Sequence, residues 1–256
     1  MTDLALQCEA LTVAVPGRTL VRDLALNVPH GSVLAVLGRN GAGKSSTLHT
    51  LAGLREAASG AVRVNGRPLL EWTRRDLACV LALLPQLAED PFPATAMEAV
   101  LVGRHPHLDF WSWESDADRA AARGALAAVD LAGLEARDIA TLSGGERRRL
   151  SIATILAQDP AIFLLDEPIH QLDPQHQLGV LRLFRRLADA GRTVVITLHD
   201  VGHAARIADS ALLLFGDGRW QHGDCASVLN EESIGRLYGI PVRELRWDGG
   251  RTFVAA

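Results

Sequence analysis

Cysteine is scarce in this sequence of 256 residues, and long apolar runs are missing. The three cysteines, Cys8, Cys79 and Cys225, are far apart and form no Cys-x-x-Cys pair, so we expect neither a disulfide framework nor a zinc site. Such cysteine usage is typical of a reducing compartment such as the cytoplasm. No apolar run approaches the ~20 residues that a membrane span requires, and the first residues do not resemble a secretory signal. We therefore expect a soluble chain whose link to a membrane, if any, is through a partner.

A surplus of basic charge is missing too, because 26 basic and 30 acidic residues give a formal net charge of -4. This balance excludes a sequence-independent grip on nucleic acid or on anionic lipid. The arginine clusters at 147–149 and at Arg182, Arg185 and Arg186 are therefore predicted to be solvated helix faces. With 48% apolar residues the chain can fill a core, as one large domain or two small ones, which excludes disorder.

Strand and helix patterns alternate along the chain. The expected strands cover residues 4–14, 19–28, 32–37, 61–64, 161–165, 193–198 and 210–215. The expected helices cover residues 44–53 and 174–190. An alanine-rich stretch at 97–158 has helical periodicity, with Ser115 as a capping candidate. These patterns predict an α/β fold with a largely parallel sheet and an inserted α-helical subdomain.

Residues 38–45, Gly-Arg-Asn-Gly-Ala-Gly-Lys-Ser, fit the phosphate-binding pattern G-x4-G-K-[ST] between a predicted strand and a predicted helix. Glycines let backbone N–H groups close on phosphate oxygens, and the helix N-terminus adds positive potential. Lys44 would neutralise the β and γ oxygens, and Ser45 is placed to ligate magnesium. The predicted nucleotide-binding residues are Gly38, Arg39, Asn40, Gly41, Ala42, Gly43, Lys44, Ser45 and Ser46.

Lys44 is also the only lysine in the chain, since the other 25 basic residues are arginine. Abundant arginine and alanine are what a GC-rich coding bias would produce. Under that bias, a surviving lysine marks a position that arginine cannot fill. A compact ammonium and a wide planar guanidinium differ enough for a tight phosphate cradle to discriminate between them.

Two further motifs carry chemistry. The apolar strand at 161–165 ends in Asp166 and Glu167, where an aspartate can hold the magnesium shell and a glutamate can deprotonate water. Earlier in the chain, Leu-Ser-Gly-Gly-Glu at 142–146 precedes a helix predicted over 147–157. Ser143 is a good N-cap followed by two small residues, so this helix N-terminus is a second candidate anion site.

Together these motifs resemble the ATP-binding subunits of ABC transporters, in which LSGGE is the family signature. The resemblance spans nearly the whole chain. It implies a single ABC ATPase domain over 1–256 with a P-loop NTPase core and N-terminal antiparallel strands. Residues 1–90 and 159–256 would form the core and the C-terminal part, and residues 91–158 the helical signature subdomain.

The resemblance also implies roles for individual residues. Gln86 in Leu-Leu-Pro-Gln looks like the Q-loop glutamine, His199 in Thr-Leu-His-Asp like the switch histidine at the γ-phosphate, and Leu172-Asp173 like the D-loop. The implied catalytic residues are Glu167, His199 and Gln86. The implied magnesium ligands are Ser45, Gln86 and Asp166. The remaining implied nucleotide contacts are Ser143, Gly144, Gly145, Glu146 and Asp173. ATP and Mg²⁺ are the implied cofactors.

In that family two ATPs lie between the P-loop of one subunit and the signature of the other, so one site needs two chains. Two places depart from the family pattern. Val15 stands where an aromatic usually stacks on adenine, and Ile-His-Gln at 169–171 replaces the common Thr-Asn-His before the D-loop. The aromatic segment at 110–113, Phe-Trp-Ser-Trp, has two alternative interpretations: it belongs to the core of the helical subdomain, or it is part of a docking surface.

Two short segments, 103–107 and 236–242, look like those of ATPases that serve importers of iron-siderophores, haem and cobalamin. This resemblance implies a homodimer at the cytoplasmic face of a bacterial inner membrane, held there peripherally by permease subunits. A periplasmic substrate-binding protein would feed the permease, and no nucleic acid would be involved. The alternatives are an ABC transporter ATPase for a different cargo, a soluble ABC ATPase of DNA repair or translation, and a simple P-loop kinase. The kinase would leave the signature and His199 unexplained.

Overall fold

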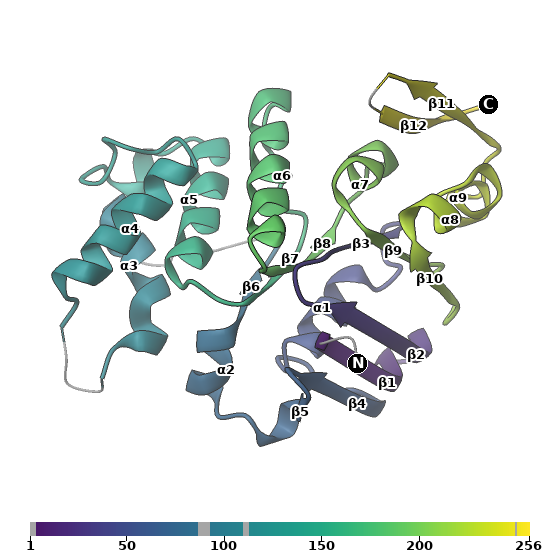
Figure 1. The fold of residues 1–256 in the computed structure, drawn as a ribbon, viewed down its shortest axis with the longest axis horizontal. Coiled ribbons are helices and arrows are strands. Elements are labelled where there is room, and N and C mark those ends of the chain that lie inside the picture. Colours follow the sequence, from purple (N-terminus) through teal and green to yellow (C-terminus); the bar gives the residue numbers. More distant parts are fainter. Residues whose placement is uncertain (1–3, 87–92, 110–112, 249) are drawn as a thin grey trace.

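The computed structural model describes residues 4–86, 93–109, 113–248 and 250–256. A six-stranded sheet in the order β10-β9-β3-β8-β7-β6 forms its centre (Figure 1). Its strands are β3 (Val33–Gly38), β6 (Leu81–Leu84), β7 (Ile162–Leu165), β8 (Thr193–Thr197), β9 (Ser210–Leu214) and β10 (Trp220–Asp224). Only β10 runs antiparallel to its neighbour within this sheet. The parallel strands consist mostly of buried apolar residues, as expected for a sheet covered on both faces, and they confirm the largely parallel sheet.

A second sheet at the N-terminus is antiparallel, in the order β2-β1-β4-β5, as expected from the resemblance. It contains β1 (Leu4–Val15), β2 (Arg18–Pro29), β4 (Ser59–Val64) and β5 (Arg67–Pro68). Its buried face packs with α1 (Lys44–Leu51) and one face of the central sheet in a single apolar cluster that includes Leu24, Leu48 and Val36. The P-loop helix is thereby clamped between the two sheets.

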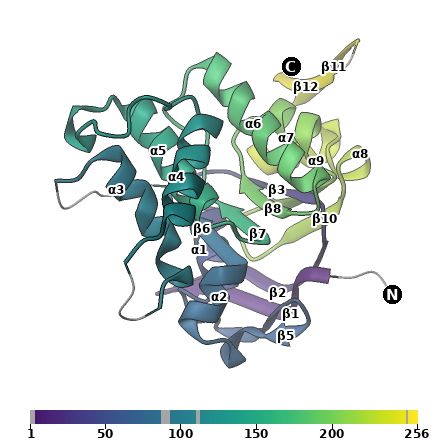
Figure 2. The same ribbon diagram turned by 60° about the vertical axis from the view of Figure 1, so that its left-hand side comes forward.

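The helical elements between β6 and β7 gather at one end of the molecule in both views (Figures 1 and 2). They are α3 (Ala96–Leu101), η2 (Val102–His107), α4 (Asp116–Ala128), η3 (Ile139–Thr141) and α5 (Gly144–Ala157). Ser115 caps α4, as predicted, in a capping box with Asp118. Helix α5 begins at Gly144, three residues earlier than predicted, because the capping box of Ser143 draws both glycines into the first turn.

The second half of the chain carries α6 (Pro174–Asp189), α7 (Val201–Ile207), α8 (Cys225–Val228), α9 (Glu231–Tyr238) and the hairpin of β11 (Val242–Trp247) and β12 (Gly250–Ala255). Helices α7 and α9 contribute to the same apolar cluster as the central sheet. The hairpin lies over α7, where the side chain of Thr252 comes close to Gly202. Among the described residues, no helix combines the length and the apolar character that crossing a membrane requires.

The sequence patterns did not predict the short elements after β4, namely η1 (Leu69–Glu71), α2 (Arg74–Val80) and strand β6. The residues from Leu77 to Leu84 form one nearly continuous apolar stretch, so no change of periodicity marks the point where the helix gives way to the strand. Strand β6 matters for the site because Gln86 lies two residues beyond its end.

Candidate functional site

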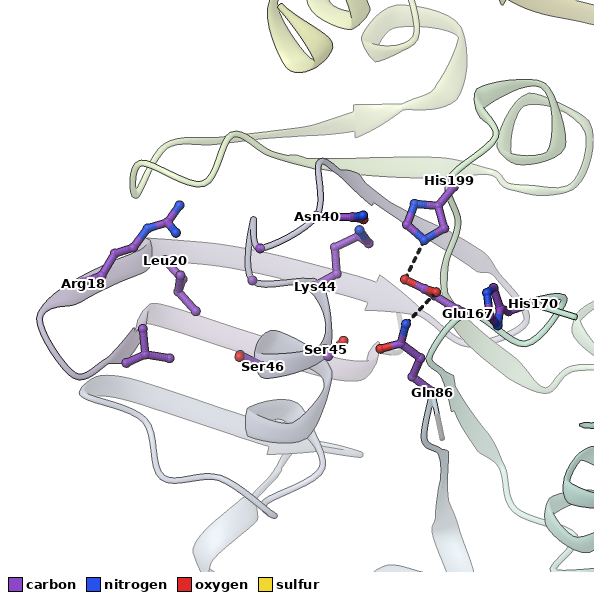
Figure 3. A pocket seen from close by; sticks show the side chains of 13 residues that line it. Arg18, Leu20, Asn40, Lys44, Ser45, Ser46, Gln86, Glu167, His170 and His199 are labelled. Carbon is purple, nitrogen blue, oxygen red and sulfur yellow. Dashed lines mark hydrogen bonds and ion pairs between the residues drawn. The ribbon is translucent and has the colours of Figure 1, made fainter. Parts of the chain in front are cut away.

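An open pocket of about 800 Å³ lies at the carboxyl edge of the central sheet, beside the P-loop (Figure 3). It is lined by Val15, Arg18, Leu20, Asn40, Gly41, Gly43, Lys44, Ser45, Ser46, Gln86, Glu167, His170 and His199. The size suits a small-molecule ligand such as a nucleotide. Most of the predicted P-loop residues and all three predicted catalytic residues therefore share one pocket.

The P-loop runs from Gly38, the last residue of β3, to Lys44, the first residue of α1. A Cβ on Gly38 would lie 2.7 Å from the carbonyl oxygen of Leu214, so only glycine fits there. Gly43 has a φ of 104°, a left-handed conformation that side chains other than glycine rarely adopt. Both glycines are thus required by backbone geometry.

The side chain of Lys44 is buried in the loop, and its Nζ donates to the carbonyl oxygen of Gly38 at 2.9 Å. Burial lowers the pKa of Lys44, while the nearby carboxylates of Glu167 and Asp166 act in the opposite direction. The ammonium is held next to the loop that would take the phosphates. Its compact shape fits this buried position better than a guanidinium would.

Asp166 and Glu167 follow β7, and the hydroxyl of Thr197 at the end of β8 bonds to both residues. It donates to Oδ1 of Asp166 at 2.8 Å and accepts from the backbone N–H of Glu167 at 2.8 Å. Asp166 is 1% exposed, and its Oδ2 has no hydrogen-bond partner. A buried, unpartnered carboxylate oxygen close enough to Lys44 to act on its pKa is chemistry that suits a hard cation such as Mg²⁺. No sequence pattern marks Thr197, because its role depends on strand pairing.

Two side chains contact the carboxylate of Glu167, one at each oxygen (Figure 3). Gln86 Nε2 donates to its Oε2 at 2.9 Å, and His199 Nε2 lies 2.6 Å from its Oε1. The three side chains come from the ends of β6, β7 and β8, which are neighbours in the sheet. Glu167 has a φ of 48°, a left-handed conformation that is uncommon outside glycine and is found at functional sites.

Arg148 corrects the prediction of a solvated arginine cluster on α5. It is 6% exposed, and burial lowers its pKa to about 10 against the opposing effect of Asp166 and Glu167. Its guanidinium donates to five backbone carbonyls, those of Pro85, Gln86, Asp166, Glu167 and Pro168, at 2.6–3.3 Å. Periodicity could have found it, because Arg148 shares the buried face of α5 with Ile152 and Ile155.

The signature residues lie away from the pocket. None of the four described residues at 143–146 lines it, and Gly145 instead packs near the backbone of Gln171, just before Leu172. Ser143 and Glu146 complete a capping box, in which the N–H of Ser143 lowers the pKa of Glu146. Asp173 caps α6 and pairs with His176 Nδ1 at 2.7 Å. The predicted site residues are thus divided between two places on this chain.

Val15 lines the pocket together with Arg18 and Leu20, so the structure puts an aliphatic side chain at the place considered for adenine stacking. Among the described lining residues, the only rings are the imidazoles of His170 and His199. In the aromatic segment, residues 110–112 lie outside the described part of the chain. Trp113 is 89% exposed, so this residue does not belong to the core of the helical subdomain.

Comparisons with known proteins agree with this geometry. The family described as ABC transporter matches residues 21–170. A hemin import ATP-binding protein of Streptomyces coelicolor is 42% identical, over 91% of this chain and 82% of the relative. An iron(3+)-hydroxamate import ATP-binding protein of Bacillus subtilis is 35% identical, over 92% and 88%.

Solved structures give the same result. An inward-facing ABC transporter thought to be of the metal-chelate type superposes with a TM-score of 0.86 at 29% identity, covering 99% of this chain and 98% of that one. An ATP-binding cassette dimer bound to ADP and phosphate superposes at 0.74 with 24% identity, covering 86% and 98%, and supports the fold. The resemblance inferred from the P-loop, the carboxylates and the signature is therefore confirmed, and this chain belongs to the ABC transporter family as an ATP-hydrolysing, ATP-binding subunit.

Proposed function

We propose that two copies of this chain hydrolyse ATP at their shared interface and thereby drive the import of an iron chelate or haem through a membrane permease. The observation that carries the proposal is the division of the site. The phosphate loop and Glu167 face one pocket, while the helix N-terminus of α5 with Ser143 lies elsewhere on the same chain. A second copy could supply the missing anion site to that pocket, and a homodimer would then form two equivalent sites.

Within the pocket the roles follow from position. Backbone N–H groups of the P-loop and Lys44 would bind the β- and γ-phosphates. Glu167 would accept a proton from the water that attacks the γ-phosphorus, as the bond to the β-phosphate oxygen breaks and ADP leaves. Gln86 and His199 each contact one oxygen of the Glu167 carboxylate here, and the remaining lone pairs would accept from the attacking water. His199 would then turn toward the γ-phosphate.

The donor set fits a magnesium ion bound with ATP. Ser45, Gln86 and the free Oδ2 of Asp166 would hold it, and it would neutralise developing charge on the phosphate oxygens. The signature residues Ser143, Gly144, Gly145 and Glu146 would contact the γ-phosphate of the ATP that is bound to the P-loop of the partner copy. Asp173 would lie at the contact between the two copies.

The helical elements within residues 91–158 offer a surface for the permease. A groove of about 640 Å³ beside α3 and η2 is lined by Met97, Leu101, Val102 and Trp113, among others. Val102 and Trp113 are 62% and 89% exposed, so apolar surface is available for a partner. We propose that an amphipathic helix of the permease docks here, which would hold the chain peripherally at the cytoplasmic face of the inner membrane. A periplasmic binding protein would deliver cargo from the other side.

The cargo rests on the names of the relatives, several of which are hemin import or iron(3+)-hydroxamate import proteins. Cobalamin rests on the sequence resemblance alone and is the weaker choice. A bacterial strain lacking this gene should fail to grow on haem or a ferric hydroxamate as the sole iron source. The wild-type gene should restore growth and the Glu167→Gln gene should not. Normal uptake of haem, ferric hydroxamate and cobalamin by the deletion strain would overturn the cargo assignment and leave the ATPase assignment intact.

A further inference from the structure

The only tyrosine of the chain contacts the backbone of the switch histidine. Tyr238 is the last residue of α9, and its hydroxyl donates to the carbonyl oxygen of His199 at 3.0 Å. The two residues are 39 positions apart. The segment 236–242 resembled those of certain importer ATPases, and the function proposed above gives it no task.

The backbone around His199 is fixed at both ends. On one side, the N–H of Leu198 donates to the carbonyl oxygen of Val36, at 3.2 Å, in the neighbouring strand β3. On the other side, Asp200 caps α7 through the N–H groups of Gly202 and His203. The bond from Tyr238 is made to the His199 residue itself, between these two anchors. It therefore acts on the residue whose Nε2 lies 2.6 Å from Glu167.

Helix α9 can hold the phenol in place because it is itself well anchored. Ile234 and Leu237 are 1% and 2% exposed and pack in the same cluster as α7. Gly239 ends the helix in a left-handed conformation with φ of 73°, and a Cβ there would lie 3.7 Å from Nη1 of Arg39 in the P-loop. Burial raises the pKa of Tyr238 to about 12, so the hydroxyl remains a donor at physiological pH.

We propose that Tyr238 is a positioning residue, which holds the His199 backbone so that its imidazole reaches Glu167 in the resting state and the γ-phosphate during turnover. The inference rests on the proposed role of His199. The side chain of His199 is 49% exposed, so few contacts of the ring itself restrict its position. The position of the ring depends on the backbone that carries it, and small displacements of a catalytic group reduce rates strongly.

The test is Tyr238→Phe, which removes one hydroxyl and keeps the packed ring. Ser233→Ala is the matched control, because Ser233 is on the same helix and its hydroxyl donates to Gln221 Oε1 at 3.3 Å, away from His199. We expect both variants to lower Tm by similar small amounts. Only Tyr238→Phe should lower kcat, by about fivefold, the factor that corresponds to one ordinary hydrogen bond. Rates are measured well below both Tm values, so that the folded fraction does not differ.

A second readout separates positioning from a general weakening of the fold. In a Glu167→Gln background, Tyr238→Phe should weaken ATP binding while ADP binding is unchanged, since only ATP carries the γ-phosphate. Equal kcat values for Tyr238→Phe and Ser233→Ala, or equal losses of ATP and ADP affinity, would overturn the proposal. If the Glu167→Gln enzyme alone hydrolyses ATP at the wild-type rate, the proposed function fails instead, so the two failures are distinguishable.

Discussion

Replacing Arg148 with methionine should both destabilise the fold and slow ATP hydrolysis. The guanidinium donates to five carbonyls in two segments, Pro85 and Gln86 after β6 and residues 166–168 after β7. Methionine has a similar reach but no donor, so these buried carbonyls would lose a charged partner. The buried carboxylates of Asp166 and Glu167 would also lose a neighbouring positive charge, and removing one partner from a buried charged network costs about 3–5 kcal/mol.

We therefore expect the free energy of unfolding to fall by about 4 kcal/mol. For a chain of this size, each kcal/mol of lost stability lowers Tm by about 2–4 °C, so we expect Tm to fall by roughly 8–16 °C. Because the same guanidinium ties the backbone of Gln86 to that of Glu167, kcat should fall at least about tenfold even well below Tm. Urea unfolding and steady-state ATPase assays measure the two effects separately.

Arg149→Met is the matched control. Arg149 is the next residue on the same helix, is less buried, and donates to the carbonyls of Val129 and Asp130 at 2.9 Å, away from the pocket. The free energy of unfolding of Arg149→Met should fall less than that of Arg148→Met, and its kcat should equal that of the wild type. The reasoning about Arg148 would be refuted if Arg148→Met unfolded with a free energy within about 1 kcal/mol of wild type, below the cost of a broken buried network. A kcat equal to that of the Arg149 variant would also refute it.

Three further outcomes are expected. Lys44→Ala should lose ATP affinity in calorimetry, and Lys44→Arg should not restore it; full restoration would refute the shape argument. Val15→Tyr should tighten ATP binding by about 0.5–1.5 kcal/mol through ring stacking, and the wild type should hydrolyse GTP within several-fold of ATP; an unchanged ATP affinity would mean that another group covers the base. Hydrogen bonds from Ser115 and then Arg104 lower the pKa of Asp118 to about 2, so its charged form stabilises the fold above pH 3.8. Asp118→Asn should therefore lower the free energy of unfolding at pH 7, and the difference should shrink as pH falls toward 2, whereas a pH-independent difference would contradict this.

The parts of the site that sequence predicted are those whose requirements are local. Turn geometry requires the glycines of the P-loop and phosphate binding requires Lys44, and both requirements are contained within eight residues. The structure places this segment between β3 and α1. The alternating strands and the Ser143 cap were predictable for the same reason. Periodicity and capping are read over a few neighbouring positions.

What the sequence could not show depends on partners far along the chain. Helical periodicity could have marked Arg148 as buried, but it could not identify the carbonyls 18–63 positions away to which Arg148 donates. The hydroxyl of Thr197 bonds to Asp166 and Glu167 only because β7 and β8 pair in a particular register. Strand β6 was missed because its apolar residues continue those of α2. In each case tertiary contacts, which are invisible in a single sequence, decide the role.

The central claim is that Glu167 removes a proton from water at a site completed by a second copy of the chain. The measurement that tests it most directly is light scattering of the Glu167→Gln protein with magnesium and ATP, alongside its rate of phosphate release. An amide cannot accept the proton, whereas the phosphate contacts remain, so the variant should bind ATP, release no phosphate and form a dimer that dissociates with ADP. Phosphate release at the wild-type rate, or a variant that binds ATP and stays monomeric, would contradict the account.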